Sequence, residues 1–190
     1  MSRPIANCAY LPIALLGCLG IVLPGCVPPP ERSEKAPETQ AEEAASVDPQ
    51  VELRVANAPA NGWGEGIAWR SFEEGQAEAK ALGRPMMLVV WTSWCPNCRA
   101  LKKPFSKNDE IRELSHQFVM VNVDQDELPM VSRIGPDGDY IPRVIFLDAE
   151  GEVDTAVLNS KRRRSLYFYS PVDDVPAKMR EALERHPTSS

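Results

Sequence analysis

The sequence predicts an α/β domain with a central mixed sheet and helices on both faces. Segments 86–91, 118–123 and 143–147 are largely apolar and have the length of strands that are buried on both faces. Segments with helix start and stop signals alternate with them, in the order strand, helix, strand, helix, strand, strand, helix. This order is typical of a sheet that is covered by helices on each side.

The first part of the folded region carries a short strand and a capped helix. Residues 67–69 are predicted to form the strand. Ser71 and Glu74 have the spacing of a capping box, so a helix is expected to begin there. It is expected to end at Gly83, shortly before the first buried strand.

Two further helical segments are expected after the strand at 86–91. One covers 95–105, with Pro104 kinking or ending it. Asn108 is a good N-cap residue and is expected to begin the other, which runs through Leu114. These two segments separate the first buried strand from the second.

The last part of the chain is predicted to hold a further strand and a final helix. Turn signals at 135–138 precede the third buried strand, and another strand is expected around 153–158. Ser170 as N-cap and Pro171 in the first turn predict a helix that runs to about Arg185.

The N-terminal third has the composition of an export signal followed by a spacer. Arg3 precedes an apolar run at 10–23 that is shorter than the roughly 20 residues of a membrane-spanning helix, so residues 1–25 are predicted to be a signal peptide. Residues 26–61 are rich in Pro, Glu and Ala and are predicted to be a disordered linker. The folded domain is expected over 62–187.

The end of the predicted signal peptide carries a cysteine in a distinctive setting. Leu23-Pro24-Gly25-Cys26 resembles the lipobox of bacterial lipoproteins, in which the cysteine becomes the lipidated first residue. The resemblance implies an exported lipoprotein that is anchored at Cys26 and faces the periplasm or the cell exterior. The alternative is a plain signal peptide with an incidental cysteine.

Two cysteines in the middle of the chain, Cys95 and Cys98 in TSWCPNCR, are predicted to be redox-active. The strand before them delivers Cys95 to a helix N-terminus, where backbone N–H groups and the helix dipole favour a thiolate and lower the cysteine pKa. Cys98 follows one turn later on the same side of the helix. The pair can therefore close a disulfide and reopen it.

Other uses of this cysteine pair fit less well. A zinc site needs four ligands, but the only histidines, His116 and His186, lack the paired spacing of such a site. Haem attachment requires Cys-x-x-Cys-His, and here Arg99 follows the second cysteine. A structural bridge across so short a loop would add little stability. We expect neither a metal nor a cofactor.

The surroundings of these cysteines resemble the thioredoxin-like superfamily. Residues 94–98 follow a buried strand, and Ile141-Pro142 precedes another strand some forty residues later. Longer stretches are similar to the small single-domain secretory-pathway branch that includes the anterior gradient proteins; these are AWRSFEEGQAEAK, SWCPNCRALKKPF, ELSHQFVMVNVD, PDGDYIPRVIFLD and SLYFYS. The resemblance implies a thioredoxin-like fold.

The resemblance also assigns roles to individual residues. Cys95 would be the nucleophile that forms a mixed disulfide, and Cys98 the thiol that resolves it. Pro142 would follow a cis peptide bond and border the substrate groove together with the backbone of Ile141. Trp94 would shield one side of the sulfur, or alternatively serve as simple packing.

One pair of positions departs from the family pattern. Many thioredoxins bury an acid six positions before the first cysteine, and here that position is Val89. The lysine that partners this acid would fall near Met120. The usual proton acceptor for the second cysteine is therefore absent from its usual place.

These observations predict an extracytoplasmic, membrane-tethered thiol–disulfide oxidoreductase that acts on protein thiols and disulfides as a monomer. The formal net charge of −6 argues against a nucleic-acid partner. Two alternatives stay open: a non-catalytic module that binds client chains, and a dedicated reductase for one partner such as a cytochrome-maturation factor.

Overall fold

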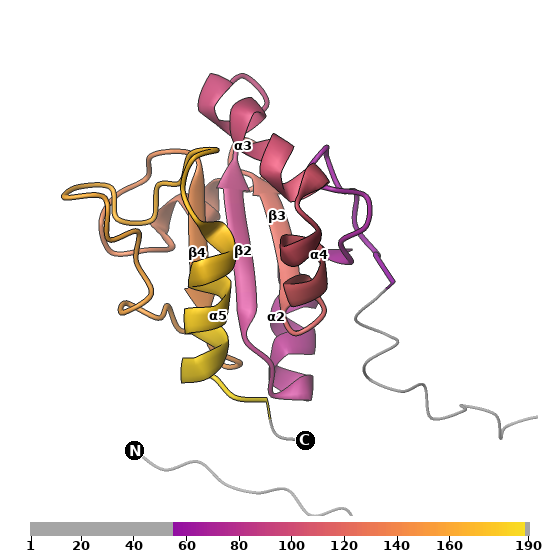
Figure 1. Ribbon diagram of the computed structural model, residues 1–190. Helices are drawn as coiled ribbons and strands as arrows, with labels where there is room; N and C mark the ends of the chain where they lie inside the picture. Colours follow the sequence, from indigo (N-terminus) through magenta and orange to yellow (C-terminus); the bar gives the residue numbers. More distant parts are fainter. Residues whose placement is uncertain (1–54, 189–190) are drawn as a thin grey trace, which may run out of the picture. The chain divides into compact units, whose positions relative to one another are not determined.

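The computed structural model describes residues 55–188, which form an α/β domain (Figure 1). The predicted signal peptide, the lipidation at Cys26 and most of the predicted linker lie outside the described residues. Within the described range, no helix has both the length and the apolar character needed to cross a membrane.

The centre of the domain is a four-stranded mixed sheet with the strand order β1-β3-β2-β4. β3 pairs in parallel with β1 on one side and with β2 on the other, and β4 runs antiparallel to β2. The strands are β1 Trp69–Arg70, β2 Met86–Trp91, β3 Val119–Asp124 and β4 Arg143–Leu147. The three apolar segments of the sequence thus form the three long strands, as predicted.

Helices cover both faces of this sheet, which confirms the predicted fold class. They are α2 Phe72–Leu82, α3 Pro96–Lys107, α4 Asp109–Ser115, the 3₁₀ helix η1 Pro129–Arg133 and α5 Val175–Arg185. Alternate residues of β2 belong to two separate apolar clusters, because successive side chains of a strand point to opposite faces. One cluster includes residues of α3, α4 and α5, and the other includes residues of α2.

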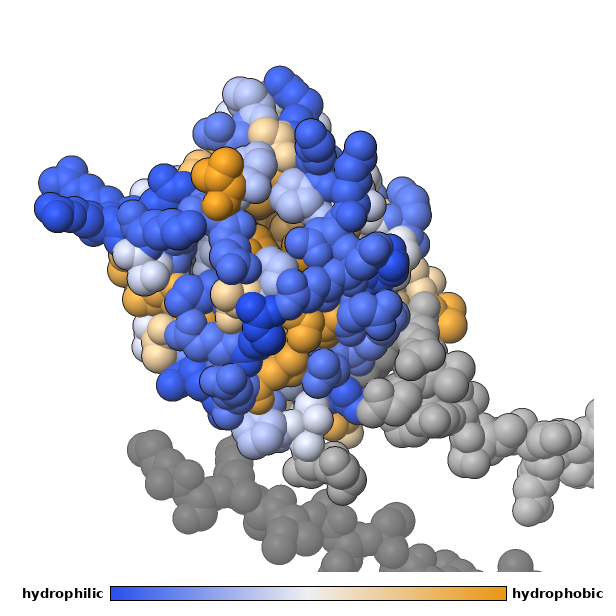
Figure 2. Space-filling view, in the orientation of Figure 1, coloured by the Kyte–Doolittle hydropathy of each residue, from blue (hydrophilic) through white to orange (hydrophobic). Residues whose placement is uncertain are grey.

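Most of the apolar side chains are used in these two clusters. The face seen in Figure 1 is mainly hydrophilic, with small apolar areas between polar side chains (Figure 2). In residues 55–188 the strongly exposed large apolar side chains are Val55, Trp94, Met130 and Val172. Trp94 is the one that belongs to the predicted site.

The helix boundaries follow the predicted capping residues at two places. Gly83 ends α2 in the left-handed conformation, with φ of 60°. Asn108 is the N-cap of α4, and its side chain accepts hydrogen bonds from the backbone N–H groups of Glu110 and Ile111 at 2.8 and 3.3 Å. Pro104 lies inside α3 without ending it, so the helix continues to Lys107.

The strand predicted around 153–158 is absent, and that prediction is wrong. A single bridge between Val153 and Leu147 is all that pairs with the sheet there. The side chain of Asp154 accepts a hydrogen bond from the backbone N–H of Ala156 at 2.9 Å, so the chain turns instead of extending.

The final helix begins later than predicted. Its N-cap is Asp174, which accepts from the backbone N–H of Ala177 at 3.0 Å, and Pro176 occupies the first turn. Ser170 serves a different turn, because its backbone N–H and hydroxyl both donate to Asp173, at 2.8 and 2.7 Å. The predicted end at Arg185 is confirmed.

Residues 57–61, which the sequence analysis places in the linker, lie against the sheet. The backbone N–H groups of Asn57 and Ala58 donate to the carbonyl of Trp69 at 3.0 and 3.1 Å. Ala60 belongs to the apolar cluster of α3, α4 and α5. The packed part of the chain therefore begins several residues before residue 62.

Candidate active site

β2 and α3 together place Cys95 at the start of a helix. β2 ends at Trp91, and a short loop leads to Cys95, which is the N-cap of α3. The Cys95 Sγ accepts a hydrogen bond from the backbone N–H of Cys98 at 3.1 Å. The sulfur therefore lies at the positive end of the helix dipole. Pro96 fits directly after it, because its missing N–H would have no partner there.

Cys98 has a more apolar setting than Cys95. Its side chain is fully buried, whereas that of Cys95 retains 3% exposure. Burial is the main cause that raises the pKa of Cys98 to about 12, and a hydrogen bond with the Cys95 side chain adds to it. A hydrogen bond with the Thr92 backbone and the charge of Lys102 lower this pKa. Both cysteines are free thiols in this structure. The two cysteines are therefore adjacent but differ in burial: Cys95 lies at the edge of the core, and Cys98 lies inside it.

The loop before Cys95 is held by the end of β3. Asp124 is buried at the last position of β3, and its carboxylate accepts hydrogen bonds from the backbone N–H groups of Ser93 and Asp126, at 3.1 and 3.0 Å. Arg99 donates to the carbonyls of Ser93 and Trp94 at 3.3 and 3.1 Å. No role in the site was predicted for Asp124 from the sequence, although it directly follows a segment that was predicted to be a buried strand.

Trp94 stands out of the surface beside Cys95. It is 63% exposed, and its Nε1–H donates to the carboxylate of Asp126 at 2.7 Å. A side chain this exposed contributes little to the core, so the structure does not support the alternative that Trp94 is simple packing. The hydrogen bond fixes the direction of the ring relative to the loop.

The sheet register brings Pro142 toward the same edge as the cysteines. Val90 of β2 pairs with Arg143 of β4, and these strands are antiparallel. The start of β4 therefore lies beside the end of β2, from which the chain leads to Cys95. The Ile141–Pro142 peptide bond is cis. Pro142 is buried, while Ile141 is partly buried and packs against the cluster that contains both cysteines.

Arg143, directly after Pro142, holds the preceding loop from inside, and the sequence analysis missed it. Its side chain is fully buried. It donates to five acceptors at 2.7–3.1 Å: the carbonyls of Val131, Ser132, Ile134 and Gly138, and the side chain of Gln125. No carboxylate is among them. A lone arginine after proline gives no sequence signal for such a network, because its partners come from a loop without regular spacing.

The positions of the missing acid and its lysine are apolar and buried. Val89 is fully buried, pairs with Asn122 and Val144 across the sheet, and belongs to the same apolar cluster as both cysteines. Met120 is 1% exposed and lies in that cluster too. The departure seen in the sequence therefore corresponds to an apolar environment behind Cys98.

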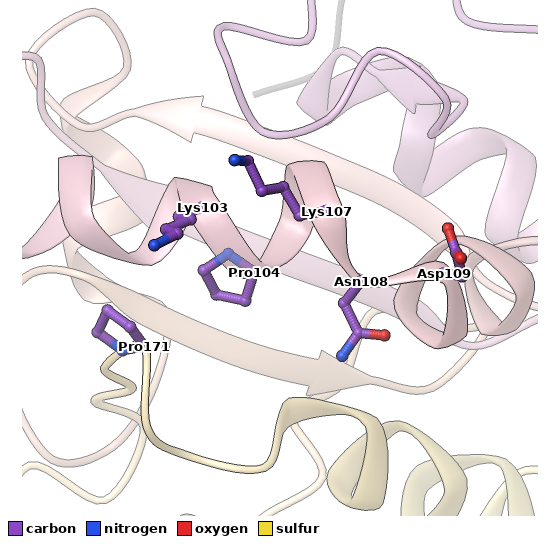
Figure 3. Close-up of a pocket in the computed structure, with 6 residues that line it drawn as sticks. All are labelled: Lys103, Pro104, Lys107, Asn108, Asp109 and Pro171. Carbon is purple, nitrogen blue, oxygen red and sulfur yellow. The ribbon is translucent and has the colours of Figure 1, made fainter.

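A separate hollow of about 550 Å³ lies along α3, and neither cysteine lines it (Figure 3). Its walls are Lys103, Pro104, Lys107, Asn108, Asp109 and Pro171. Within residues 55–188, no three His, Cys, Asp or Glu side chains are grouped as a metal site would require. The dithiol is therefore the chemically distinctive feature of the described domain.

Comparisons with known proteins agree with this fold. A family model described as thioredoxin-like matches residues 68–149. Anterior gradient protein 3 of Mus musculus is 35% identical over 124 residues, which is 64% of this chain and 73% of that protein. Anterior gradient protein 2 homolog of Mus musculus is 31% identical over 140 residues, covering 73% of this chain and 78% of that protein.

The solved structure titled "DsbH Oxidoreductase" has a TM-score of 0.44 and 21% identity, covering 61% of this chain and 83% of that chain.

A dithiol at a helix N-terminus after the central strand, in a fold of this family, defines the class as a thiol–disulfide oxidoreductase. The chain belongs to the thioredoxin-like superfamily and lies near its anterior gradient branch.

Proposed function

We propose that the protein is an extracytoplasmic, membrane-tethered oxidoreductase that works through the Cys95–Cys98 dithiol/disulfide couple. The hydrogen bond from the Cys98 backbone N–H to the Cys95 Sγ, at the N-terminus of α3, carries the proposal. It places the less buried sulfur at the start of a helix and a second thiol one turn away. Both are requirements of a two-step disulfide exchange.

Reduction of a substrate disulfide takes place in two steps of thiol–disulfide exchange. The Cys95 thiolate attacks one sulfur of a substrate disulfide, forms a mixed disulfide with it and releases the other substrate sulfur as a thiolate. Cys98 then loses its proton and attacks the Cys95 sulfur. The Cys95–Cys98 disulfide forms, the bond to the substrate breaks, and the remaining substrate sulfur leaves as a thiolate. Two electrons pass from the protein to the substrate, and the reverse sequence oxidises a substrate dithiol.

Trp94, Ile141 and Pro142 are proposed to border the groove in which the substrate chain lies. The exposed indole of Trp94 stands on one side of Cys95. The antiparallel register of β2 and β4 brings the Ile141–Pro142 segment to the same sheet edge. An extended substrate chain would thus pass between an aromatic ring and the backbone before β4.

The cellular setting is proposed from the sequence of the N-terminal third. The segment at 1–25 has the pattern of an export signal, and Cys26 ends a lipobox-like segment. Residues from Cys26 onward would tether and space the domain, which we expect to act as a monomer. Mass spectrometry of the mature N-terminus tests the anchor: a lipid-modified Cys26 supports it, and an unmodified start at any other residue contradicts it.

Trapping experiments test the two cysteine roles. Cys98→Ala, incubated with a peptide disulfide, is expected to accumulate a covalent mixed disulfide at Cys95, because the resolving thiol is missing. Cys95→Ala is the matched control and is expected to form no such adduct. Equal adduct formation by both variants, or none by either, would contradict the assigned roles. A module that only binds client chains would retain the peptide without forming a covalent bond.

A further inference from the structure

Lys102 lies one turn after Cys98 on α3, and its ammonium group is held over two aromatic rings. Its Nζ lies 3.9 Å from the centre of the Trp91 ring and 5.6 Å from that of the Trp63 ring. A cation over a tryptophan face is attracted by the ring quadrupole. Both tryptophans belong to the apolar cluster that contains Cys95 and Cys98. The charge of Lys102 is therefore fixed at the border of that cluster.

The turn at Gly62 covers the stem of this lysine. A Cβ atom at Gly62 would lie 3.4 Å from Cδ of Lys102 and 4.0 Å from its Nζ. The side chain thus runs between a backbone turn and the aromatic rings, and it is partly buried. Such enclosure limits the rotamers that the side chain adopts, so the charge does not swing freely into solvent.

No carboxylate in residues 55–188 lies within ion-pair distance of Lys102. Burial lowers the pKa of Lys102, while Cys98 on the same helix and Asp124 at the end of β3 act in the opposite direction. The Asp124 carboxylate already accepts the backbone N–H groups of Ser93 and Asp126. The ammonium charge therefore has no direct carboxylate partner and remains available to a neighbouring sulfur.

The resolving step needs such a charge. Cys98 is fully buried, and its burial opposes the formation of a thiolate. Val89 and Met120 occupy the places where the family often has an acid and a lysine, so neither can assist. On α3, residues four apart are neighbours, which places Lys102 beside Cys98.

We propose that the Lys102 ammonium stabilises the Cys98 thiolate while the mixed disulfide is resolved. The inference rests on the proposed function and adds a residue to it. Cys98 gives its proton to solvent water, Lys102 keeps its own proton throughout, and the Cys98 thiolate attacks the Cys95 sulfur. Lys102 acts through Cys98 and touches no substrate. Lys102 on α3 thus provides electrostatic support for Cys98 in place of the acid and the lysine that are absent at Val89 and Met120.

Stopped-flow reaction with the disulfide of thionitrobenzoate separates the two steps. The full chain is used in detergent with Cys8, Cys18 and Cys26 replaced by Ser, so that Cys95 and Cys98 are its only thiols. Attack by Cys95 releases one thionitrobenzoate in a bimolecular phase. Attack by Cys98 on the mixed disulfide releases the second in a phase whose rate does not depend on reagent concentration.

Lys102→Met keeps the stem that packs on the tryptophans but removes the charge. We expect it to slow the second phase about tenfold and to move its pH profile upward, because one pKa unit changes the thiolate fraction about tenfold. The first phase is expected to change much less. Lys102→Arg retains the charge and is expected to restore most of the rate.

Lys103→Met is the matched control, because Lys103 is exposed and faces the hollow along α3 (Figure 3). It is expected to leave both phases unchanged. A second phase of unchanged rate and pH profile in Lys102→Met, or an equal slowing in Lys103→Met, overturns the role of Lys102. If the chain with Lys102 intact shows no second release, the proposed function itself fails, so the two failures are distinguishable.

Discussion

Arg143 and Cys98 are both fully buried near the edge of the sheet where β2 ends and β4 begins, but their surroundings differ. Arg143 donates to five acceptors, and its charge is shared among backbone carbonyls. Cys98 lies in an apolar cluster, and the Lys102 ammonium one turn away on α3 lowers its pKa only partly against the effect of burial. The first region is rich in hydrogen bonds from the two terminal nitrogens of Arg143, although its Nε has no partner, and these bonds hold the loop before Pro142 in place.

In the second region, the protonation of the Cys98 sulfur depends on the charges close to it. A network of many buried hydrogen bonds rigidifies a structure, whereas the protonation of a poorly solvated group responds strongly to one nearby charge. The comparison predicts that substitutions in the Arg143 region affect mainly the free energy of unfolding. Substitutions around the cysteines should affect mainly the rates of disulfide exchange.

The largest effect is expected for Cys95→Ser. The hydroxyl still caps α3, so the free energy of unfolding should change by less than about 1 kcal/mol. Disulfide exchange should fall to the uncatalysed rate, because serine cannot form the mixed disulfide. Urea unfolding and glutathione exchange measure the two effects. If Cys95→Ser lost several kcal/mol of unfolding free energy together with its activity, the distinction between the two regions would be contradicted.

Arg143→Met is expected to lower the free energy of unfolding by about 3 kcal/mol or more. The variant removes five hydrogen bonds from a buried guanidinium, and a hydrogen bond to a charged group contributes about 1.5–3 kcal/mol. The control is Arg164→Met, at an exposed arginine, which should change stability by about 0.5 kcal/mol or less. Urea unfolding checks both, and equal losses would show that the network around Arg143 has no special weight.

Asp154 is another buried charged group, and like Arg143 it has several hydrogen-bond partners. Burial alone would raise its pKa, but hydrogen bonds from Arg185, the Ala156 backbone and His186 lower it to about 2. A depressed carboxyl pKa contributes stability above the pKa of the unfolded chain, here about 2 kcal/mol, which is lost as the pH falls from about 5 toward 2.

Asp154→Asn removes this titration, so its unfolding free energy should depend less on pH in that range. Urea unfolding at several acidic pH values measures the dependence for both proteins. Parallel curves for the two proteins would exclude Asp154 as the source of the acid sensitivity.

The smallest effect is expected for Trp94→Phe, which loses the exposed hydrogen bond to Asp126. Stability should change by less than about 1 kcal/mol, since exposed hydrogen bonds contribute little. Trp94→Ala removes the ring as well and is expected to slow exchange with a peptide disulfide more than with glutathione, because only the longer substrate reaches the ring. Equal slowing of the two substrates would argue against a groove at Trp94.

The fold was predictable where one local pattern decided the structure. The long strands are continuous apolar segments, and Asn108 begins α4 by its own side chain. The predicted start of α5 was wrong because two segments have the pattern of a helix start: Ser170-Pro171, and Asp174 with Pro176. A tertiary contact distinguishes them: Asp173 pairs with Arg162 at 2.8 Å and binds Ser170 into a turn.

The site was predictable to the extent that its chemistry lies in one short segment. Cys95 and Cys98 are three residues apart, so the sequence shows their relation directly. Arg143 and Lys102 were not predicted because their partners lie in other elements and loops, at no regular spacing: the loop at 125–138 for Arg143 and the tryptophans for Lys102. Only the packed fold reveals such contacts.

The central claim is that the fold makes this dithiol reactive, and one measurement tests it directly. The full chain with Cys8, Cys18 and Cys26 replaced by Ser is exchanged with oxidised glutathione, once folded and once unfolded in urea, at the same pH. The account predicts that the folded chain forms its Cys95–Cys98 disulfide much faster than the unfolded chain does. A folded chain that exchanges no faster than the unfolded one would contradict the claim.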